Sequence, residues 1–350
     1  MGTLSRAAPR APSAVLLEAH DNRWLAFVEA HPDSLPAHGS AWLRTLAEAY
    51  GFRPFVLAVT ASGGRIEAGI PLLDVRDRLR GRRWIALPFT DRCPPLATGT
   101  EARARVAGAL AGAAADAGIR CVQVRAPLTA WAPSPVAVMH ELDLSPGWDA
   151  VERSFSSLAR RNVRKARREG VVVRRATFAG ELIDVYYRLH LRTRRRLGVP
   201  VQPRRFFRSL WRHMLEPGLG ELLLAWANGV PIAGAVFLRA ARTVVYKYGA
   251  SDERGWRLRP NNLLMAEAIG RSVKDGFSRF DFGRTDFADA GLRSFKLGWG
   301  ATERPLVYSW LDGHRASSGP SGGRALAEII RHCPIGVCRM IGEGLYRYAA

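Results

Sequence analysis

The stretch ELLLAWANGVPIAGAVFLRAARTVVYKYGASD, residues 221–252, contains three apolar runs separated by two polar turns. Runs of this length, rich in β-branched and aromatic residues, predict an antiparallel meander. A helical segment follows over residues 262–275, and Gly276 occupies the position of a helix C-cap glycine. The β-like run FSRFDFGR, residues 277–284, comes next. The order β-β-β-α-β predicts an α/β (α+β) fold with a mixed sheet flanked by helices.

An earlier stretch repeats this arrangement. Residues 54–91 read PFVLAVTASGGRIEAGIPLLDVRDRLRGRRWIALPFTD, again three apolar runs with turns between them. The second run holds Ala68-Gly69, as the later copy holds Ala233-Gly234. An Ala-rich helical segment over residues 101–117 and the β-like IRCVQVRA follow in the same order. We therefore predict two tandem units of one supersecondary pattern.

The repeat suggests a domain division. We predict an N-terminal unit over 14–147, a C-terminal candidate catalytic unit over 148–311, a linker over 312–324 and an amphipathic helical tail over 325–350. The linker prediction rests on the Gly- and Ser-rich composition of DGHRASSGPSGGR.

Composition and charge limit the functional classes. The 350 residues are 47% hydrophobic and 24% charged, which is typical of a globular protein and excludes a collagen-like or wholly disordered chain. Lys and Arg number 52 and Asp and Glu 31, so the formal net charge is +21. That charge favours polyanionic partners. Abundant Arg and Ala are equally typical of high-GC coding, and both interpretations stay open.

The cysteine spacing predicts free thiols in a reducing cytoplasm and no metal site. The four cysteines, Cys93, Cys121, Cys333 and Cys338, include no Cys-x-x-Cys pair. No apolar run reaches the length that spans a bilayer. We therefore expect a cytoplasmic protein, with peripheral attachment to the membrane as an open alternative.

Several segments resemble one family. These are SSLARRNVRKARREGVVVRR (156–175), YYRLHLRTRRRLGVP (186–200), YKYGASDERGWRLRPNNLLMAEAI (246–269), FDFGRTD (280–286) and GLRSFKLGWGA (291–301). They resemble the FemAB-like branch of the GNAT acyltransferases, which includes peptidoglycan-bridge aminoacyltransferases and exopolysaccharide-associated acyltransferases. The resemblance implies two tandem GNAT-like units and the transfer of an acyl group to an amine.

The helix-entry turn departs from the coenzyme A-binding pattern. GNAT enzymes that use acetyl-CoA usually have a Gly-rich turn whose backbone N–H groups hold the pyrophosphate. Here residues 257–262 read RLRPNN, without glycine, and Pro260 removes one N–H. FemAB-like aminoacyltransferases share this loss and use aminoacyl-tRNA. Acetyl-CoA and aminoacyl-tRNA therefore both remain candidate co-substrates.

The resemblance implies catalytic roles for two residues. Lys296, in the Phe-Lys pair after the last helix, is expected beside the reacting carbonyl, where a cation stabilises an oxyanion. Asp281, at the end of a predicted strand, can accept the amine proton or orient a neighbour. The first unit has Gln123 where the second has Asp281, which predicts a scaffold role for the first unit. A surface lysine and a structural salt bridge are the alternatives.

Other residues are candidates for binding. The predicted substrate-binding set is Tyr246, Tyr248, Arg257, Asn261, Asn262, Arg284, Arg195 and Trp299. Strand alternation predicts that Lys247 faces away from both tyrosines. The helix-entry residues have plain helix capping as their alternative role.

A basic helix offers a second kind of surface. Residues 160–175 hold eight basic side chains, and Arg161, Arg164, Lys165 and Arg168 are candidate polyanion-binding residues. A solvated helix face is the alternative. The basic tail either docks on the body or lies on a membrane, and we expect docking.

The function that these patterns favour is N-acyl transfer. We expect an acyl or aminoacyl group to move to an amine of a nucleotide- or lipid-linked cell-envelope peptide or glycan precursor. The alternatives are an acyl-CoA-dependent N-acetyltransferase of an exopolysaccharide sugar and a non-catalytic polyanion-binding module.

Overall fold

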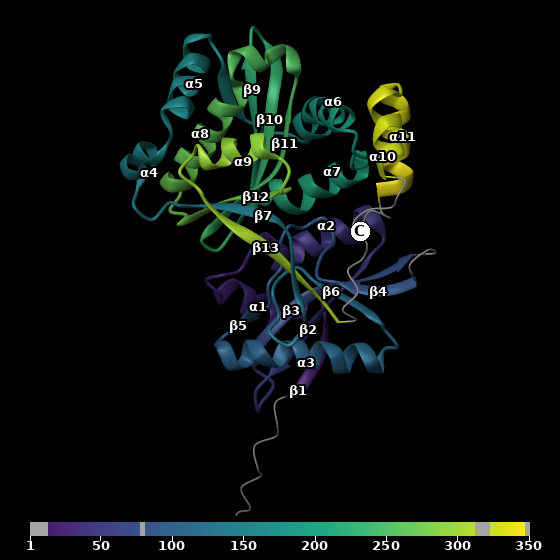
Figure 1. The fold of residues 1–350 in the computed structure, drawn as a ribbon. Coiled ribbons are helices and arrows are strands. Elements are labelled where there is room, and N and C mark those ends of the chain that lie inside the picture. Colours follow the sequence, from purple (N-terminus) through teal and green to yellow (C-terminus); the bar gives the residue numbers. More distant parts are fainter. Residues whose placement is uncertain (1–12, 78–80, 312–322, 347–350) are drawn as a thin grey trace, which may run out of the picture. The chain divides into compact units, whose positions relative to one another are not determined.

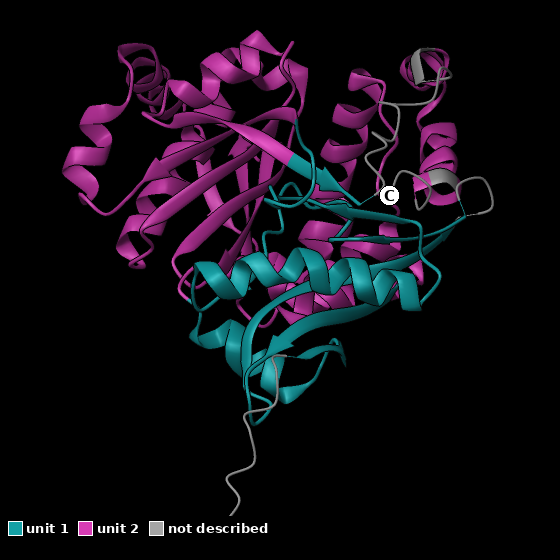
Figure 2. Ribbon diagram, turned by 60° about the horizontal axis from the view of Figure 1, so that its bottom comes forward, with its two compact units in different colours: residues 1–31, 53–134, 308–313 teal, residues 32–52, 135–307, 314–350 magenta. Residues whose placement is uncertain are grey.

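The computed structural model describes residues 13–77, 81–311 and 323–346 (Figure 1). Tertiary contacts divide the chain into two compact units (Figure 2). Unit 1 comprises residues 1–31, 53–134 and 308–313, and unit 2 comprises residues 32–52, 135–307 and 314–350. Compared with the division expected from sequence, residues 32–52 join the later unit and residues 308–313 join the earlier one. Of the linker expected over 312–324, residues 312–322 lie outside the described part of the chain.

Unit 1 is built on one sheet. Its elements are β1 (Ser13–Glu18), α1 (Asn22–Ala30), β2 (Arg53–Thr60), β3 (Ile66–Asp77), β4 (Gly81–Ile85), β5 (Leu96–Ala97), α3 (Thr100–Asp116) and β6 (Cys121–Val124). Strands β2, β3 and β4 form an antiparallel meander. After α3, β6 pairs in parallel with β4. The β-β-β-α-β order expected for the first repeat is confirmed.

Unit 2 repeats this plan with more helices. Its sheet strands are β7 (Pro133–Asp143, shared at its start with unit 1), β8 (Val172–Arg175), β9 (Gly220–Ala227), β10 (Val230–Ala240), β11 (Thr243–Ser251) and β12 (Arg279–Thr285), and β13 (Thr302–Trp310) ends in unit 1. The meander β9-β10-β11 is antiparallel, and β12 pairs in parallel with β11 after α8 (Pro260–Lys274). Strand β7 continues the sheet beside β12.

Unit 2 contains further helices besides α8. They are η1 (Pro36–His38), α2 (Ser40–Tyr50), α4 (Trp148–Ser154), α5 (Ser157–Arg168), the π-helical turn η2 (Glu181–Tyr186), α6 (Tyr187–Leu197), α7 (Arg204–Leu210), η3 (Trp211–Leu215), η4 (Glu253–Leu258), α9 (Ala290–Leu297), α10 (Gly323–His332) and α11 (Ile335–Leu345). Residues 181–197 and 204–215 each form a continuous helical segment that includes one π-helical turn.

The repeated Ala-Gly pair has the same physical cause in both units. A Cβ on Gly69 would lie 2.6 Å from the Trp24 ring of α1. A Cβ on Gly234 would lie 2.8 Å from the Tyr186 ring of η2. In each unit, an aromatic side chain from a helix that precedes the meander in the sequence packs directly on the second meander strand. Only glycine leaves room for that ring.

Both crossover helices end in the same way. Gly118 after α3 and Gly276 after α8 have positive φ angles of 66° and 81°. The N–H of Phe277 then bonds the carbonyl of Ser272, and the N–H of Ile119 bonds that of Ala114. These are Schellman bonds, which satisfy the last carbonyls of a helix. The C-cap glycines expected from sequence are therefore confirmed.

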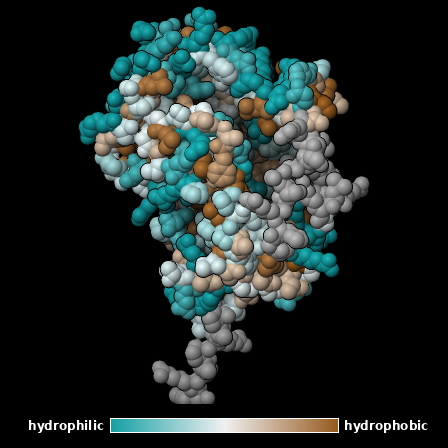
Figure 3. All heavy atoms as spheres, in the orientation of Figure 1, coloured by the Kyte–Doolittle hydropathy of each residue, from teal (hydrophilic) through white to brown (hydrophobic). Residues whose placement is uncertain are grey.

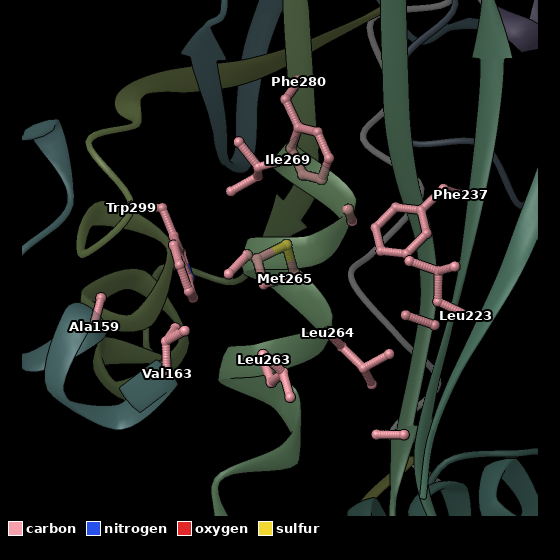
Figure 4. Close-up of a cluster of buried hydrophobic side chains, with 14 of the residues drawn as sticks. Ala159, Val163, Leu223, Phe237, Leu263, Leu264, Met265, Ile269, Phe280 and Trp299 are labelled. Carbon is pink, nitrogen blue, oxygen red and sulfur yellow. The ribbon is translucent and has the colours of Figure 1, made fainter. Parts of the chain in front are cut away.

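The core of unit 2 lies between its sheet and the helices α5 and α8. Figure 4 shows Trp299 among Val163 of α5 and Met265 and Ile269 of α8. Phe155 meets Trp299 edge to face, with ring centroids 4.9 Å apart. Leu158 of α5 is 54% exposed, and the buried residues of α5 are Ala159, Val163 and Ala166.

The C-terminal hairpin of α10 and α11 docks on α6. The hairpin packs closely against Gly198, because a Cβ at this position would lie 2.8 Å from the carbonyl oxygen of Ala327. Tyr346 stacks on Tyr50 of α2 at 5.9 Å between centroids. Docking of the tail, the outcome expected from sequence, is the arrangement in the structure.

Candidate active site

The parallel strands β11 and β12 pair over a short distance. Their ladder runs from Thr243–Arg279 to Val245–Asp281. The residues that follow on both strands lie beyond the register of this ladder. The carboxyl ends of the two parallel strands therefore present backbone groups that the β11–β12 ladder does not use. Asp281 is the last residue of β12 in that ladder.

A bulge in β12 brings the two expected catalytic residues to one glycine. The register against β7 shifts between Asp281 and Arg284, and Gly283 in this bulge has φ of 71°. Asp281 Oδ1 accepts a hydrogen bond of 2.8 Å from the N–H of Gly283. Lys296 Nζ donates to the carbonyls of Gly283 and Arg284 at 2.9 and 3.0 Å.

Both of these charged side chains are buried. Asp281 is 3% exposed and Lys296 is 2% exposed. Lys296 lies in the last turn of α9, so its bonds also fix that helix against β12. A buried ammonium group keeps its charge only with close polar partners, and the bulge carbonyls supply two of them. The site thus holds a fixed positive group beside the carboxyl end of β12.

Sequence reasoning missed a second polar cluster behind Lys296. His140 of β7 is completely buried, and its Nε2 lies 3.0 Å from Glu303 Oε2. Glu303 receives two hydrogen bonds from Arg293 of α9, at 2.7 and 2.8 Å. Burial, followed by the positive charge of Lys296, lowers the pKa of His140. Burial thus favours the neutral form of His140, although Glu303 opposes the shift. Only its position in the middle of an apolar strand could have indicated it.

Arg284 points to the surface. Its guanidinium bonds Asp286 Oδ1 at 2.6 Å and the carbonyl of Val136 at 3.4 Å. The side chain is about two-fifths exposed, so this pair is partly screened by solvent.

A second bulge changes the orientation of the β11 side chains. Val236 faces Tyr248 and Phe237 faces Tyr246, so Lys247 is the extra residue. Lys247 Nζ lies 5.4 Å from the centroid of the Tyr248 ring. The expectation that Lys247 faces away from both tyrosines is therefore wrong, because the bulge breaks the alternation that it assumed.

The two tyrosines have different surroundings. Tyr248 meets the rings of His190, Phe206 and Phe207 in an aromatic cluster. Tyr246 packs on Phe237, and burial raises the pKa of Tyr246 to about 12. Both tyrosines are half-buried and contribute mainly apolar contact area.

The structure places Trp299 in the core. It is completely buried between Phe155 and Phe295. This position gives Trp299 a packing role in unit 2 and no surface for a substrate.

The entry of α8 is formed by a strained arginine. Arg259 is the N-cap residue and has φ of 59°, a left-handed conformation. The N–H groups of Asn262 and Leu263 both donate hydrogen bonds to the carbonyl of Arg259. Pro260 has no N–H to donate. This turn therefore offers fewer backbone donors to a pyrophosphate than a Gly-rich turn does. Arg257 and Asn261 are exposed and Asn262 is half-buried.

Arg195 lines a pocket rich in arginine, which we call the arginine pocket. Its volume is about 390 Å³. Helix α6, the start of η4 and the C-terminal hairpin form its walls. The lining residues are Arg192, Arg195, Arg196, Ser251, Asp252, Glu253, Arg254, Arg331 and Ile335. Asn261 reaches the same wall through a bond of 3.4 Å from Nδ2 to Ser251 Oγ.

The charges of the arginine pocket are partly paired. Asp252 accepts bonds from Arg192 at 2.6 Å and from Arg254 at 2.7 Å. The hydrogen bonds from Arg254 lower the pKa of Asp252 to about 2. Glu253 pairs with Arg196 at 3.3 Å. Five arginines face two acidic residues in the lining, so the pocket is positive and suits an anion.

Arg195 differs from the other arginines of the pocket. Its Nε is buried, and this atom makes no hydrogen bond within the described part of the chain. A buried guanidinium N–H without a partner is costly. An anion in the pocket would meet the guanidinium of Arg195, which is one of the lining side chains.

The basic face of α5 is a separate surface. Arg161, Arg164 and Arg168 are exposed and Lys165 is half-buried. The upper face in Figure 3, where α5 lies, is mostly hydrophilic. Neighbouring Arg167 pairs with Glu267 at 3.1 Å. These side chains do not line the arginine pocket.

Among residues 13–77, 81–311 and 323–346, no group of three or more His, Cys, Asp or Glu side chains is placed to hold a metal ion. In the same ranges, every helix is too short or too polar to cross a bilayer.

Unit 1 has a strained segment that sequence reasoning also missed. Leu87 and Phe89, which follow β4, both have positive φ angles, of 59° and 61°. Arg125 donates to the carbonyl of Thr90, and Tyr308 Oη donates to that of Asp91 at 2.8 Å. These bonds hold the strained segment in place. The sequence carries no signal for it, because neither residue type favours positive φ.

Comparison with known proteins agrees with this fold. The family described as "Acetyltransferase (GNAT) domain" matches residues 153–303. The structure of FemX covers 85% of this chain and 96% of its own, at 15% identity and a TM-score of 0.67. No curated protein matches the sequence.

Two further solved structures share the fold. The C-terminal domain of a putative lysylphosphatidylglycerol synthetase from Agrobacterium fabrum is 14% identical, with a TM-score of 0.55, covering 88% of this chain and 95% of its own. A tandem GNAT protein from the clavulanic acid biosynthesis pathway is 13% identical, with a TM-score of 0.52, covering 87% and 100%. Residues 153–303 thus match a GNAT acetyltransferase domain, and the chain shares its fold with FemX and with a tandem GNAT protein.

Proposed function

We propose that this acyltransferase moves an acyl or aminoacyl group to the amine of a cell-envelope peptide or glycan precursor. The observation that carries the proposal is the β12 bulge, where Asp281 and Lys296 bond the same residue, Gly283. This cluster lies inside the region that matches the GNAT family. FemX and the putative lysylphosphatidylglycerol synthetase share the fold, which supports an envelope-related acceptor.

The reaction needs a neutral amine and a stabilised oxyanion. When the amine attacks an ester or thioester carbonyl, negative charge develops on the carbonyl oxygen. The ammonium of Lys296 supplies fixed positive charge at the bulge. Asp281 receives the amine proton or orients the group that does. The substrate carbonyl would lie at the carboxyl ends of β11 and β12.

The acceptor is proposed to carry phosphate. The arginine pocket is positive, and the buried Nε of Arg195 has no partner among the described residues. Guanidinium groups bind phosphate through paired hydrogen bonds. A nucleotide- or lipid-linked precursor has such a phosphate or pyrophosphate. We place this reaction in the cytoplasm, with lipid-linked acceptors at the inner membrane surface.

The donor is proposed to be an aminoacyl ester, such as aminoacyl-tRNA. The α8 entry has few backbone donors for the pyrophosphate of coenzyme A, because of Pro260 and the bonds to Arg259. The basic face of α5 offers a surface for the phosphate backbone of an RNA. The family description names an acetyltransferase, which favours acetyl-CoA as the donor. The second candidate function is therefore an acyl-CoA-dependent N-acetyltransferase, for which we propose an exopolysaccharide sugar as the acceptor.

Calorimetric titration with acetyl-CoA separates these donors. No heat up to millimolar acetyl-CoA is the result expected for an aminoacyl ester donor. Saturable binding in the micromolar range would contradict it and favour the sugar N-acetyltransferase. Incubation with aminoacyl-tRNA and an amine-bearing, nucleotide-linked muropeptide is then expected to give the aminoacylated product.

Charge reversal on α5 tests the RNA contact. We expect Arg161→Glu with Arg164→Glu to weaken tRNA binding and to reduce the slope of its salt dependence by about two. The matched control is Arg103→Glu with Arg120→Glu, two exposed arginines of unit 1. Equal weakening by both pairs would mean that net charge alone drives the binding.

A further inference from the structure

Two cysteines meet at the turn of the C-terminal hairpin. Cys333 follows the end of α10, and Cys338 lies in the first turn of α11. Their Sγ atoms are 3.1 Å apart. Both sulfur atoms also contact the carbonyl of Ile330, at 3.7 Å from Cys333 and 3.3 Å from Cys338. The helical turn therefore holds the two thiols side by side.

This separation needs only a small change to become a bond. A disulfide has its sulfur atoms about 2.05 Å apart, so the two atoms must approach by roughly 1 Å. Side-chain rotation within a two-helix turn can supply that movement. The cysteines are five positions apart, and Pro334 between them fixes the start of α11.

The thiols differ in accessibility. Cys333 is half-buried and Cys338 is buried. Burial, with the hydrogen bond to Cys333, raises the pKa of the Cys338 thiol to about 11. The more accessible Cys333 is therefore the thiol that a soluble reagent meets first. Cys338 is placed to attack Cys333 and complete the exchange.

The turn that carries these cysteines is also a wall of the arginine pocket. Arg331 and Ile335, two residues either side of Cys333, both line the pocket. Arg195, another lining residue, is close enough to Cys338 for its charge to favour the thiolate. A covalent change at the cysteine pair therefore acts directly on the pocket lining.

We propose that Cys333 and Cys338 form a dithiol–disulfide site whose oxidation fixes the hairpin wall of the arginine pocket. The oxidant is a small disulfide of the glutathione class. The Cys333 thiolate attacks one sulfur of glutathione disulfide, which gives a mixed disulfide and releases one glutathione. The Cys338 thiolate then attacks Cys333 Sγ, forms the internal disulfide and releases the second glutathione. Two protein thiols are oxidised, and one glutathione disulfide is reduced to two thiols.

The effect on the pocket rests on the proposed function, in which an anionic acceptor binds there. An internal disulfide fixes the backbone between Arg331 and Ile335. Ligand binding then no longer has to order this wall. We expect oxidised protein to bind roughly threefold to tenfold more tightly than reduced protein, the gain that fixing one mobile side chain gives.

Peptide mass spectrometry after incubation with glutathione disulfide tests the chemistry without any substrate. Wild-type protein and the control Cys121→Ser are expected to lose two thiols and contain a Cys333–Cys338 linkage. Cys338→Ser is expected to stop at a glutathione adduct on Cys333, because the resolving thiol is missing. Wild-type protein that keeps both thiols, or that ends as a stable adduct on Cys333, would overturn the proposal.

Calorimetry with inorganic pyrophosphate tests the link to the pocket. Oxidised wild-type protein is expected to bind more tightly than reduced protein, and Cys333→Ser is expected to lose this difference. Equal affinities in the two redox states overturn the link. If Arg195→Ala leaves pyrophosphate binding unchanged, the acceptor assignment of the pocket fails, whereas the disulfide result stands on its own measurement.

Discussion

The two repeats of this chain share a plan and differ in chemistry. In each, a meander, a crossover helix and a parallel strand follow one another, and the parallel ladder has three pairs. Gln123 ends the ladder in unit 1 and Asp281 ends it in unit 2. Both repeats also place an aromatic ring on a meander glycine. The plan is therefore a packing solution common to both copies, and the buried charged residues near the end of β12 distinguish the second copy.

The two units first differ in the residues that follow the parallel ladder. In unit 2, the bulge at Gly283 turns two carbonyls toward Lys296, a residue of a helix that unit 1 does not have at this point in its order. In unit 1, the backbone strain lies instead after β4, at Leu87 and Phe89. The proposed chemistry therefore belongs to one copy of the fold, and the role proposed for the other copy is structural.

The largest expected effect comes from removing the cation of unit 2. Lys296→Ala is expected to lower the rate of acyl transfer by about 10²–10³, the loss typical of one oxyanion-stabilising donor. Steady-state kinetics with the acyl donor that the acetyl-CoA titration favours would measure this loss. The exposed Lys274→Ala is the matched control, and Gln123→Ala tests the other copy. A loss as large for Gln123→Ala would contradict the division between an active repeat and a scaffold.

The next effect tests the shared plan. Gly69→Ala and Gly234→Ala each push a Cβ into an aromatic ring, and we expect each to lower the free energy of unfolding by about 1–3 kcal/mol. Urea unfolding monitored by circular dichroism measures both variants. Gly108→Ala is the control, because a Cβ there meets open space. If only one of the two variants is destabilised, the packing of the repeats is not equivalent.

A smaller effect is expected at the arginine pocket. Arg195→Ala removes a guanidinium with a buried, unsatisfied Nε, and we expect pyrophosphate to bind about tenfold more weakly. Arg188→Ala, on the exposed side of α6, is the control. Equal calorimetric affinities for the two variants would remove the pocket from the proposed function.

The smallest expected effect is on the stability at acid pH, to which one acidic residue in each unit contributes. Arg23 lowers the pKa of Asp21 in unit 1 to about 2, and Arg254 does the same for Asp252 in unit 2. Because the folded pKa is below the ordinary value of 3.8, each carboxylate stabilises the fold above pH 3.8. That stability is lost as the pH falls toward 2.

Acid titration of the unfolding free energy checks this prediction. Asp252→Asn and Asp21→Asn are each expected to reduce the loss of stability between about pH 4 and 2, with the larger effect for the more buried Asp252. An unchanged acid profile in both variants would contradict the assignment of these ion pairs.

Much of the site was within reach of sequence reasoning because it lies near the ends of predicted elements. Asp281 and Lys296 follow from a strand end and a family motif, and the structure brings them to one glycine. Trp299 was expected at the substrate and lies in the core, because an aromatic residue beside a motif can serve packing as easily as binding. The β11 bulge was not predictable, since nothing local in Tyr246-Lys247-Tyr248 indicates an extra residue.

Local patterns in the sequence are enough to predict the repeated order of strands and helices and the C-cap glycines, because apolar periodicity and glycine placement are local properties. Which charged side chains meet depends on the packing of distant elements. The arginine pocket joins residues from α6, η4 and the C-terminal hairpin, separated by more than a hundred positions along the chain. The pairing of His140 with Glu303 has the same origin. Contacts of this kind depend on how elements pack, which no short stretch of sequence specifies.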